Sequence, residues 1–236
     1  LLSHLIELRS RLLIIAISVV VVFICMLPFS RDIFTVISDP LREVLPGNAM
    51  IATAVASPLL TPFKLTFFAA LFLVMPIVLF QVWTFIAPGL YKKEKRFAIP
   101  LFMTSILLFY SGIAFAYFVV FPLMFGFFTS VAPEGVEVQT DIAQFLDFIT
   151  TIVFAFGIAF EVPVATVLVV WAGLTDTKKL GKARPYVFLM AFVAGMFLTP
   201  PDIISQTLLA VPVYLLYELG IIMSKVFVIK EPADNE

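Results

Sequence analysis

Long apolar runs alternate with short polar segments along almost the whole chain. An α-helix rises about 1.5 Å per residue, so about 20 residues cross a hydrocarbon core of about 30 Å. The runs therefore predict six transmembrane helices, and the first four are near or above this length. The six runs cover approximately residues 12–29, 63–87, 97–121, 145–171, 186–198 and 203–223.

The last two runs are short. Residues 186–198 number only 13 and reach about 20 Å as a helix. In the run 203–223, Gln206 and Glu218 bracket 11 residues, which reach about 17 Å. We therefore predict two short C-terminal spans and a bilayer that is thinned beside them.

The segments between the runs also carry a pattern. Residues 31–38 have the spacing of a short amphipathic helix, and Pro40 follows it as a breaker, so we expect this segment to form a cap on the outer surface. Asp141, three residues before Gln144, is a predicted cap of the fourth helix. Prolines within or near the ends of the spans should kink them, which favours a bowed, concave bundle; they are Pro76, Pro100, Pro163 and Pro212.

Composition places this bundle in lipid. The chain is 62% hydrophobic, contains 27 Phe, is only 13% charged and has a mean hydropathy of +1.11. A soluble domain of this size could not cover so much apolar surface. The sequence therefore predicts one integral membrane domain over residues 1–236, all-α and polytopic.

Basic residues set the orientation. If the N-terminus is cytoplasmic, 12 of the 15 Lys and Arg residues lie on the cytoplasmic side, and only Arg31, Arg42 and Lys64 lie outside. The positive-inside rule then predicts that both termini are cytoplasmic. Arg9 and Arg11 before the first run are typical of a signal peptide, but no small-residue cleavage site follows, so we expect a retained span. We also expect residues to precede Leu1.

The scarcity of Cys and His excludes several kinds of site. Cys25 is the only cysteine and His4 the only histidine, so the chain has no intrachain disulfide, no His-containing triad and no His-rich metal centre. It also lacks a Walker phosphate loop and an HExxH motif. We expect no metal, no cofactor, no nucleic-acid partner and no enzymatic activity.

Glu161 is the first candidate for function, because it lies 10 residues before Trp171 and so about 15 Å inside its helix. An ionised carboxylate at that depth costs roughly 3 kcal/mol on insertion scales. It could be a protonated group hydrogen-bonded to a neighbouring helix. It could instead be a docking point for another transmembrane segment, or a hydrated site in a groove opened by Pro163.

Four further residues are weaker candidates when taken singly. Glu7 could be no more than an i,i+4 partner of Arg11, and Glu94 could merely neutralise the basic residues around it. Asp202 could cap the sixth helix, and Gln206 could be an interfacial residue of a short helix.

An ordered set of motifs resembles one known family. The motifs are His4-Leu5-Ile6-Glu7-Leu8-Arg9, Ser57-Pro58 through Lys64-Leu65, Phe80-Gln81-Val82-Trp83 through Ile86-Ala87-Pro88-Gly89-Leu90-Tyr91, Glu94 with Arg96, Phe115-Ala116-Tyr117-Phe118, Phe160-Glu161-Val162-Pro163, and Thr199-Pro200-Pro201-Asp202 with Ser205-Gln206. Together they resemble the TatC proteins of the twin-arginine protein translocase, over almost the whole chain.

The resemblance implies a receptor in the bacterial inner membrane for folded precursors whose signal peptides carry two consecutive arginines. Transport would use the proton motive force, with TatB-like and TatA-like single-span partners, surrounding lipid and self-association in a larger complex.

Family roles, carried to matching positions, assign residues to three regions. They put Glu7 and Glu94 at the twin-arginine site, with Arg9 and Arg11 nearby. Glu161, Gln206 and Asp202 would be intramembrane polar or partner-contact residues, with Glu161 facing the concave groove and Gln206 near a partner helix. Pro40 would lie in the outer cap.

Two other classes of function remain as alternatives. A proton-coupled transporter of small molecules or ions would use Glu161 as the proton carrier and Asp202 as a second relay group. An intramembrane enzyme would need a nucleophile and base pair, which the sequence does not show.

Overall fold

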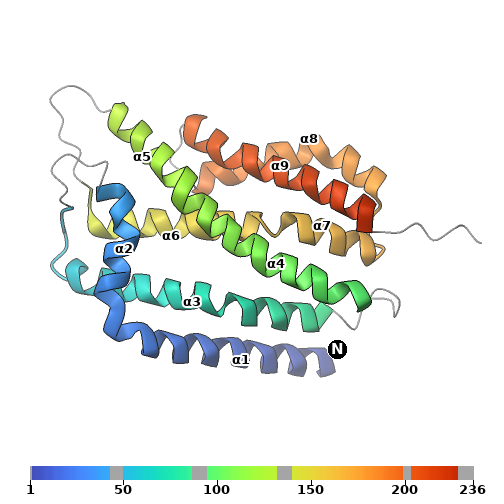
Figure 1. Cartoon of the computed structure of the whole chain (residues 1–236), viewed down its shortest axis with the longest axis horizontal. Coiled ribbons are helices and arrows are strands. Elements are labelled where there is room, and N and C mark those ends of the chain that lie inside the picture. Colours follow the sequence, from blue (N-terminus) through green and yellow to red (C-terminus); the bar gives the residue numbers. More distant parts are fainter. Residues whose placement is uncertain (1, 43–49, 87–94, 132–139, 199–202, 228–236) are drawn as a thin grey trace, which may run out of the picture. The chain divides into compact units, whose positions relative to one another are not determined.

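The computed structural model describes residues 2–42, 50–86, 95–131, 140–198 and 203–227, and these residues are almost entirely helical (Figure 1). In chain order the elements are α1 (Leu2–Met26), the 3-10 turn η1 (Leu27–Phe29), α2 (Ser30–Arg42), α3 (Ser57–Ile86), α4 (Lys95–Phe115), the π-helix η3 (Ala116–Val120), α5 (Phe121–Ser130), α6 (Ile142–Ala159), α7 (Val162–Trp171), α8 (Thr177–Leu198) and α9 (Ile203–Phe227). Within these ranges the only β-type pairing is an isolated parallel bridge between Ile51 and Asp141. The predicted all-α class is confirmed.

Five helical stretches among the described residues are long and apolar enough to cross a membrane. They are Ile6–Asp39, Ser57–Phe85, Ile99–Ser130, Ile142–Trp171 and Ile203–Val226. The remaining predicted span lies within α8, whose first turns carry several basic residues and whose apolar part is short. The chain is therefore a multi-pass membrane protein, while its orientation, bowed shape and effect on bilayer thickness stay predictions.

At two prolines the observed helices differ from the predicted runs. The run 97–121 continues through η3 and α5 to Ser130, although Pro122 follows its predicted end. A π turn is wider than an α turn, and η3 ends at Val120, two residues before Pro122, so the proline ring can avoid the carbonyl four residues before it. The predicted run 145–171 is divided into α6 and α7 just before Pro163.

The described helices form two compact units. Unit 1 comprises residues 1–88 and 114–153, so it holds α1, α2, α3, α5 and the first part of α6. Here α1 packs along α3, and α2 packs against α3 and α5. The helix predicted over residues 31–38 is confirmed as the amphipathic α2. The expectation that Pro40 breaks this helix is wrong, because α2 continues through Pro40 to Arg42.

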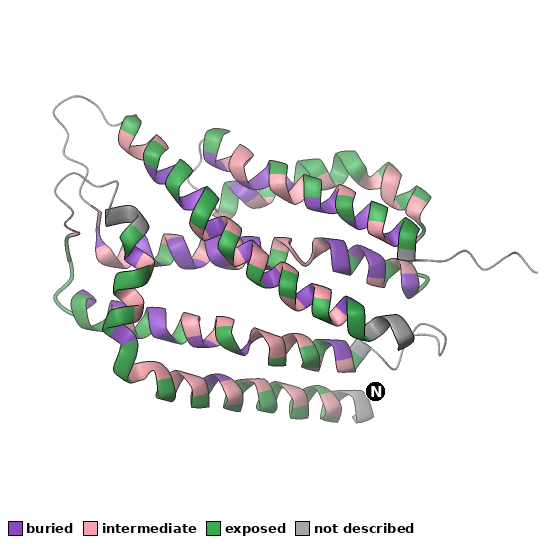
Figure 2. Ribbon diagram, viewed as in Figure 1, coloured by how far each residue is buried: buried purple, intermediate pink, exposed green. Residues whose placement is uncertain are grey.

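Aromatic side chains fill the interior of unit 1. Phe121 stacks on Phe125, with ring centroids 5.8 Å apart, and Phe125 lies 5.8 Å from both Phe145 and Phe148 of α6. In contrast to this buried interior, the residues of α1 are mostly exposed or half-buried (Figure 2). The apolar side chains of α1 are therefore left for lipid or for another protein.

Unit 2 comprises residues 89–113 and 154–236, in which α9 packs against both α7 and α8. Gly220 of α9 allows this close approach, since a Cβ atom there would lie 2.1 Å from Thr166 Oγ1 and 2.9 Å from Pro163 Cα. At the α8 and α9 contact, Arg184 donates to both oxygens of Glu218 at 2.6 and 2.8 Å. Glu218, the polar residue that shortens the apolar part of α9, is thus paired with a residue of the neighbouring helix α8.

Candidate functional site

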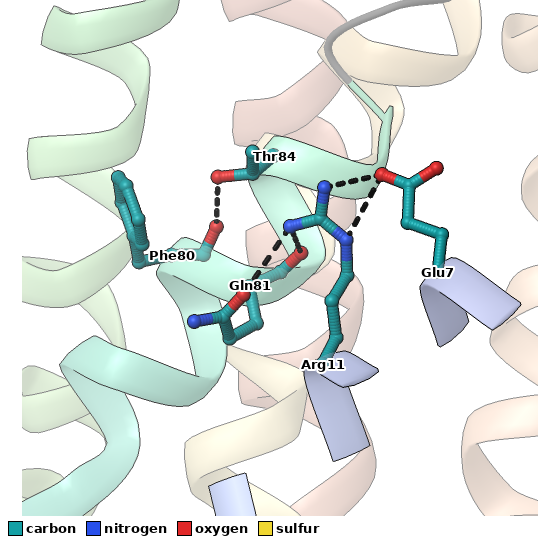
Figure 3. Close-up of polar contacts among 5 residues, drawn as sticks. All are labelled: Glu7, Arg11, Phe80, Gln81 and Thr84. Carbon is teal, nitrogen blue, oxygen red and sulfur yellow. Dashed lines mark hydrogen bonds and ion pairs between the residues drawn. The ribbon is translucent and has the colours of Figure 1, made fainter. Parts of the chain in front are cut away.

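The first candidate site lies where α1 begins and α3 ends, in unit 1 (Figure 3). Arg11 donates through Nε (3.2 Å) and Nη2 (2.5 Å) to one oxygen of Glu7, Oε1. Its remaining nitrogen, Nη1, donates to the side-chain oxygen of Gln81 at 3.2 Å and to the Gln81 carbonyl at 3.4 Å. We call Glu7, Arg11 and Gln81 the Glu7 cluster.

Local sequence explains this arrangement. Glu7 and Arg11 are four residues apart on α1, so their side chains lie on the same face of the helix. The simple helix pair considered from the sequence is therefore confirmed, and α3 adds Gln81 to it. The Arg11 side chain is 15% exposed and that of Glu7 39% exposed, so the acid is the more accessible member.

The other residues assigned to this region are placed less completely. Arg9 is exposed on α1. Glu94, the second expected acid, lies outside the described residues. The structure thus brings Arg11 to Glu7 and leaves the expected participation of Glu94 as a prediction.

Glu161 lies in the two-residue break between α6 and α7, and not within a continuous helix as the run 145–171 predicted. Pro163 accounts for this correction, because it has no N–H to donate to the carbonyl four residues earlier, at Ala159, and its ring would clash with that carbonyl. Glu161 N–H instead donates to the Ile158 carbonyl at 3.0 Å, one residue nearer than in an α-helix.

The carboxylate of Glu161 has one described partner. Ser105 of α4, in the same unit, donates its hydroxyl to Oε2 at 2.6 Å. The other oxygen, Oε1, is buried and accepts no hydrogen bond from the part of the chain that the structure describes. A hydrogen bond to a neighbouring helix, which was part of one of the two alternatives for Glu161, is therefore present, and the other carboxylate oxygen has no donor among the described residues.

The other intramembrane candidates are only partly described. Gln206 is half-buried near the start of α9, where α8 approaches it closely: a Cβ atom on Gly195 would lie 3.5 Å from Gln206 Cα. Asp202 lies outside the described residues. Pro40 lies on α2, although its side chain is not among those described.

Sequence reasoning missed Gln81 and Ser105 as partners of the two acids. Both are polar residues inside apolar runs, and this position was a usable signal.

Sequence reasoning did identify Asp141 as a helix cap: Oδ1 accepts the N–H groups of Ala143 (2.9 Å) and Gln144 (3.1 Å). The hydroxyl and N–H of Thr53 bind Oδ2 at 2.7 and 2.9 Å. Bonding to the Thr53 hydroxyl is the main cause that lowers the pKa of Asp141 to about 2.

With these sites described, comparison with known proteins decides the family. The model of the Sec-independent protein translocase protein TatC matches residues 3–212. The chain belongs to the TatC family. This family assignment agrees with the motifs that suggested it, from the segment containing Glu7 to the segment containing Gln206.

Individual TatC proteins are similar over nearly their full length. The Sec-independent protein translocase protein TatC of Azotobacter chroococcum mcd 1 is 61% identical over 94% of this chain and 87% of its own length. That of Escherichia coli O6:H1 is 57% identical over 97% of this chain and 89% of its own length. A crystal structure of a twin-arginine translocase receptor TatC superposes with a TM-score of 0.84 at 34% identity, covering 96% of this chain and all of that one.

Proposed function

We propose that this TatC protein is the receptor for twin-arginine signal peptides in a translocase that exports folded proteins. The observation that carries the proposal is the Glu7 cluster, in which an accessible carboxylate already binds a guanidinium group through Oε1. A site that holds an internal arginine has the chemistry to bind another.

Carboxylates suit this ligand because the planar arginine fork can form two parallel hydrogen bonds with one acid, whereas lysine offers a point charge. We expect one signal arginine to bind Glu7 and the other to bind Glu94. Each exposed pair is worth at most about 1 kcal/mol. Specificity must therefore come from geometry and from the apolar part of the signal peptide, which follows the arginines into the bundle.

Glu161, Gln206 and Asp202 are proposed to serve the next step, insertion of the signal and assembly with single-span TatB-like and TatA-like partners. The support is Oε1 of Glu161, which is buried without a donor among the described residues, and the close packing of α8 and α9 beside Gln206. Pro40 is assigned to an outer cap formed by α2.

The proposed setting is the bacterial inner membrane with both termini in the cytoplasm, which would place Glu7 on the side where precursors are made. The proton motive force would supply energy, and the chain itself would catalyse no reaction. Surrounding lipid and further copies of the chain complete the expected complex. The alternative of a proton-coupled small-molecule transporter is not supported, since the matched relatives are protein translocase proteins.

Peptide binding tests the proposal. Glu7→Gln and Glu94→Gln should each weaken binding of a twin-arginine signal peptide to the complex in membrane vesicles by about fivefold, the equivalent of about 1 kcal/mol. A twin-lysine peptide should lose less, because a lysine gives up a single point-charge contact whereas an arginine gives up two N–H contacts to the acid.

The matched control is Asp147→Asn, which removes another exposed acid that is paired with a basic residue, Lys64, in unit 1. It should leave both affinities unchanged. Equal losses for the two peptides in the Glu7 and Glu94 variants would contradict direct recognition of guanidinium groups.

A further inference from the structure

Arg11 is held from two sides, which makes it part of the site's framework. Its Nε and Nη2 bind Glu7, and its Nη1 binds Gln81 on a different helix (Figure 3). With its side chain only 15% exposed, Arg11 is less available to a ligand than the acid it holds.

The pairing between Arg11 and Glu7 is one-sided. Arg11 Nε and Nη2 both donate to Oε1 of Glu7, and no described residue donates to its second oxygen, Oε2. A symmetric fork pairing would use both oxygens of the acid. The Glu7 cluster therefore leaves Oε2 without a donor among the described residues while Oε1 is occupied, on a side chain that is 39% exposed.

Gln81 provides the restraint that favours this geometry. Its side-chain oxygen accepts from Arg11 Nη1 at 3.2 Å, and its carbonyl accepts from the same nitrogen at 3.4 Å. Without the side-chain contact, the guanidinium could turn to pair with both oxygens of Glu7 and would then compete with an arginine from outside.

We propose that Gln81 is a positioning residue that acts through Arg11 to present Oε2 of Glu7 to an arginine of the signal peptide. This inference rests on the proposed function and deepens it. It makes the preference for arginine over lysine a property of three residues, because Oε2 can accept two N–H groups of one guanidinium, as Oε1 does from Arg11, whereas lysine offers only a point charge.

The test measures dissociation constants of twin-arginine and twin-lysine signal peptides for the full-length chain in its membrane complex. Gln81→Met removes the acceptor and keeps the side-chain length. It should weaken twin-arginine binding about threefold and leave twin-lysine binding nearly unchanged, so the dissociation constant for twin-lysine divided by that for twin-arginine falls about threefold. Gln81→Glu retains an acceptor for Arg11 and should keep the wild-type ratio.

The matched control is Thr84→Val, one turn further along α3. The Thr84 hydroxyl donates to the Phe80 carbonyl of its own helix at 2.7 Å and has no bond to Arg11 among the described contacts, so the ratio should stay at the wild-type value. In an Arg11→Gln background, Gln81→Met should cause no further change, because its effect passes through Arg11. If Gln81→Met does not fold, Gln81→Asn, which is one methylene too short, replaces it.

Glu7→Gln separates this inference from the proposed function. If Glu7→Gln leaves twin-arginine binding unchanged, the proposed site itself is wrong. If Glu7→Gln weakens binding while Gln81→Met keeps both constants at wild-type values, or weakens both peptides equally, the role of Gln81 is overturned and the receptor proposal stands.

Discussion

At the scale of single residues, Asp141 shows how one side chain can join distant parts of a unit. It caps α6 through Ala143 and Gln144 and holds Thr53 of the segment before α3. The neighbouring backbone is tied too, since Ile142 N–H donates to the Ile51 carbonyl at 2.9 Å. The start of α6 is thus fixed to the connection that leads into α3.

The lowered pKa of Asp141 makes this junction sensitive to acid. An aspartate ordinarily titrates at about pH 3.9. The stability that the ionised Asp141 adds to the folded protein is therefore fully present above that pH and is lost as the pH falls toward about 2. We expect the thermal midpoint of the purified protein to fall over this window. Asp141→Asn should have a lower midpoint near neutral pH and a shallower fall on acidification.

Melting curves between pH 2 and pH 7 measure this effect. Thr53→Val provides a second variant, because loss of the main hydrogen bond should raise the pKa of Asp141 in the folded state, which makes the fall smaller and ends it at a higher pH. A wild-type curve that is no steeper than that of Asp141→Asn would show that the carboxylate does not stabilise the junction.

At the scale of helices, the contact between α7 and α9 depends on the absence of a side chain at one position. A methyl group at Gly220 would meet Thr166 Oγ1, which is buried and bonded to the Pro163 carbonyl at 2.7 Å. Both neighbours are fixed by α7, so they cannot move aside easily. The two helices must separate if residue 220 becomes larger.

Gly220→Ala should therefore destabilise the protein by about 1 to 3 kcal/mol, the usual cost of overpacking a filled interior. Gly126→Ala in α5 is the matched control, because no atom lies within 4 Å of the added group. Alanine favours helix over glycine by up to about 1 kcal/mol, so the control should be neutral or slightly stabilising. Denaturation of both variants in detergent measures the difference, and equal stability would mean that the helices are not tightly packed there.

The helices themselves were predictable because each is encoded by local pattern. The apolar runs gave the long helices, and the spacing of residues 31–38 gave α2. What the pattern missed depends on contacts between distant residues or on proline geometry. Gln81 reaches Arg11 across 70 positions, and the break at Glu161 follows from Pro163, which the sequence suggested as a kink and not as an interruption.

At the scale of the whole molecule, the alternation of charge predicts that both termini face the cytoplasm. Single cysteines can test this orientation after the natural one is removed by Cys25→Ser. Val55→Cys, at a fully exposed position, should react with an impermeant maleimide in intact cells. Lys179→Cys, exposed near the start of α8, should react only after the membrane is opened. The reverse labelling pattern would put Glu7 on the wrong side for a receptor of unexported precursors.

The π-helix η3 has a consequence for how sequences related to this one should be compared. A π turn closes five residues apart where an α turn closes four, so Ala116–Val120 contains about one residue more than a regular helix needs. Loss of one residue there would convert the π turn into a regular α turn. The helical segments before and after it would keep the same sides facing the core and the surface. Single-residue gaps between relatives are therefore expected to be tolerated at this point, in the middle of an otherwise uninterrupted membrane segment.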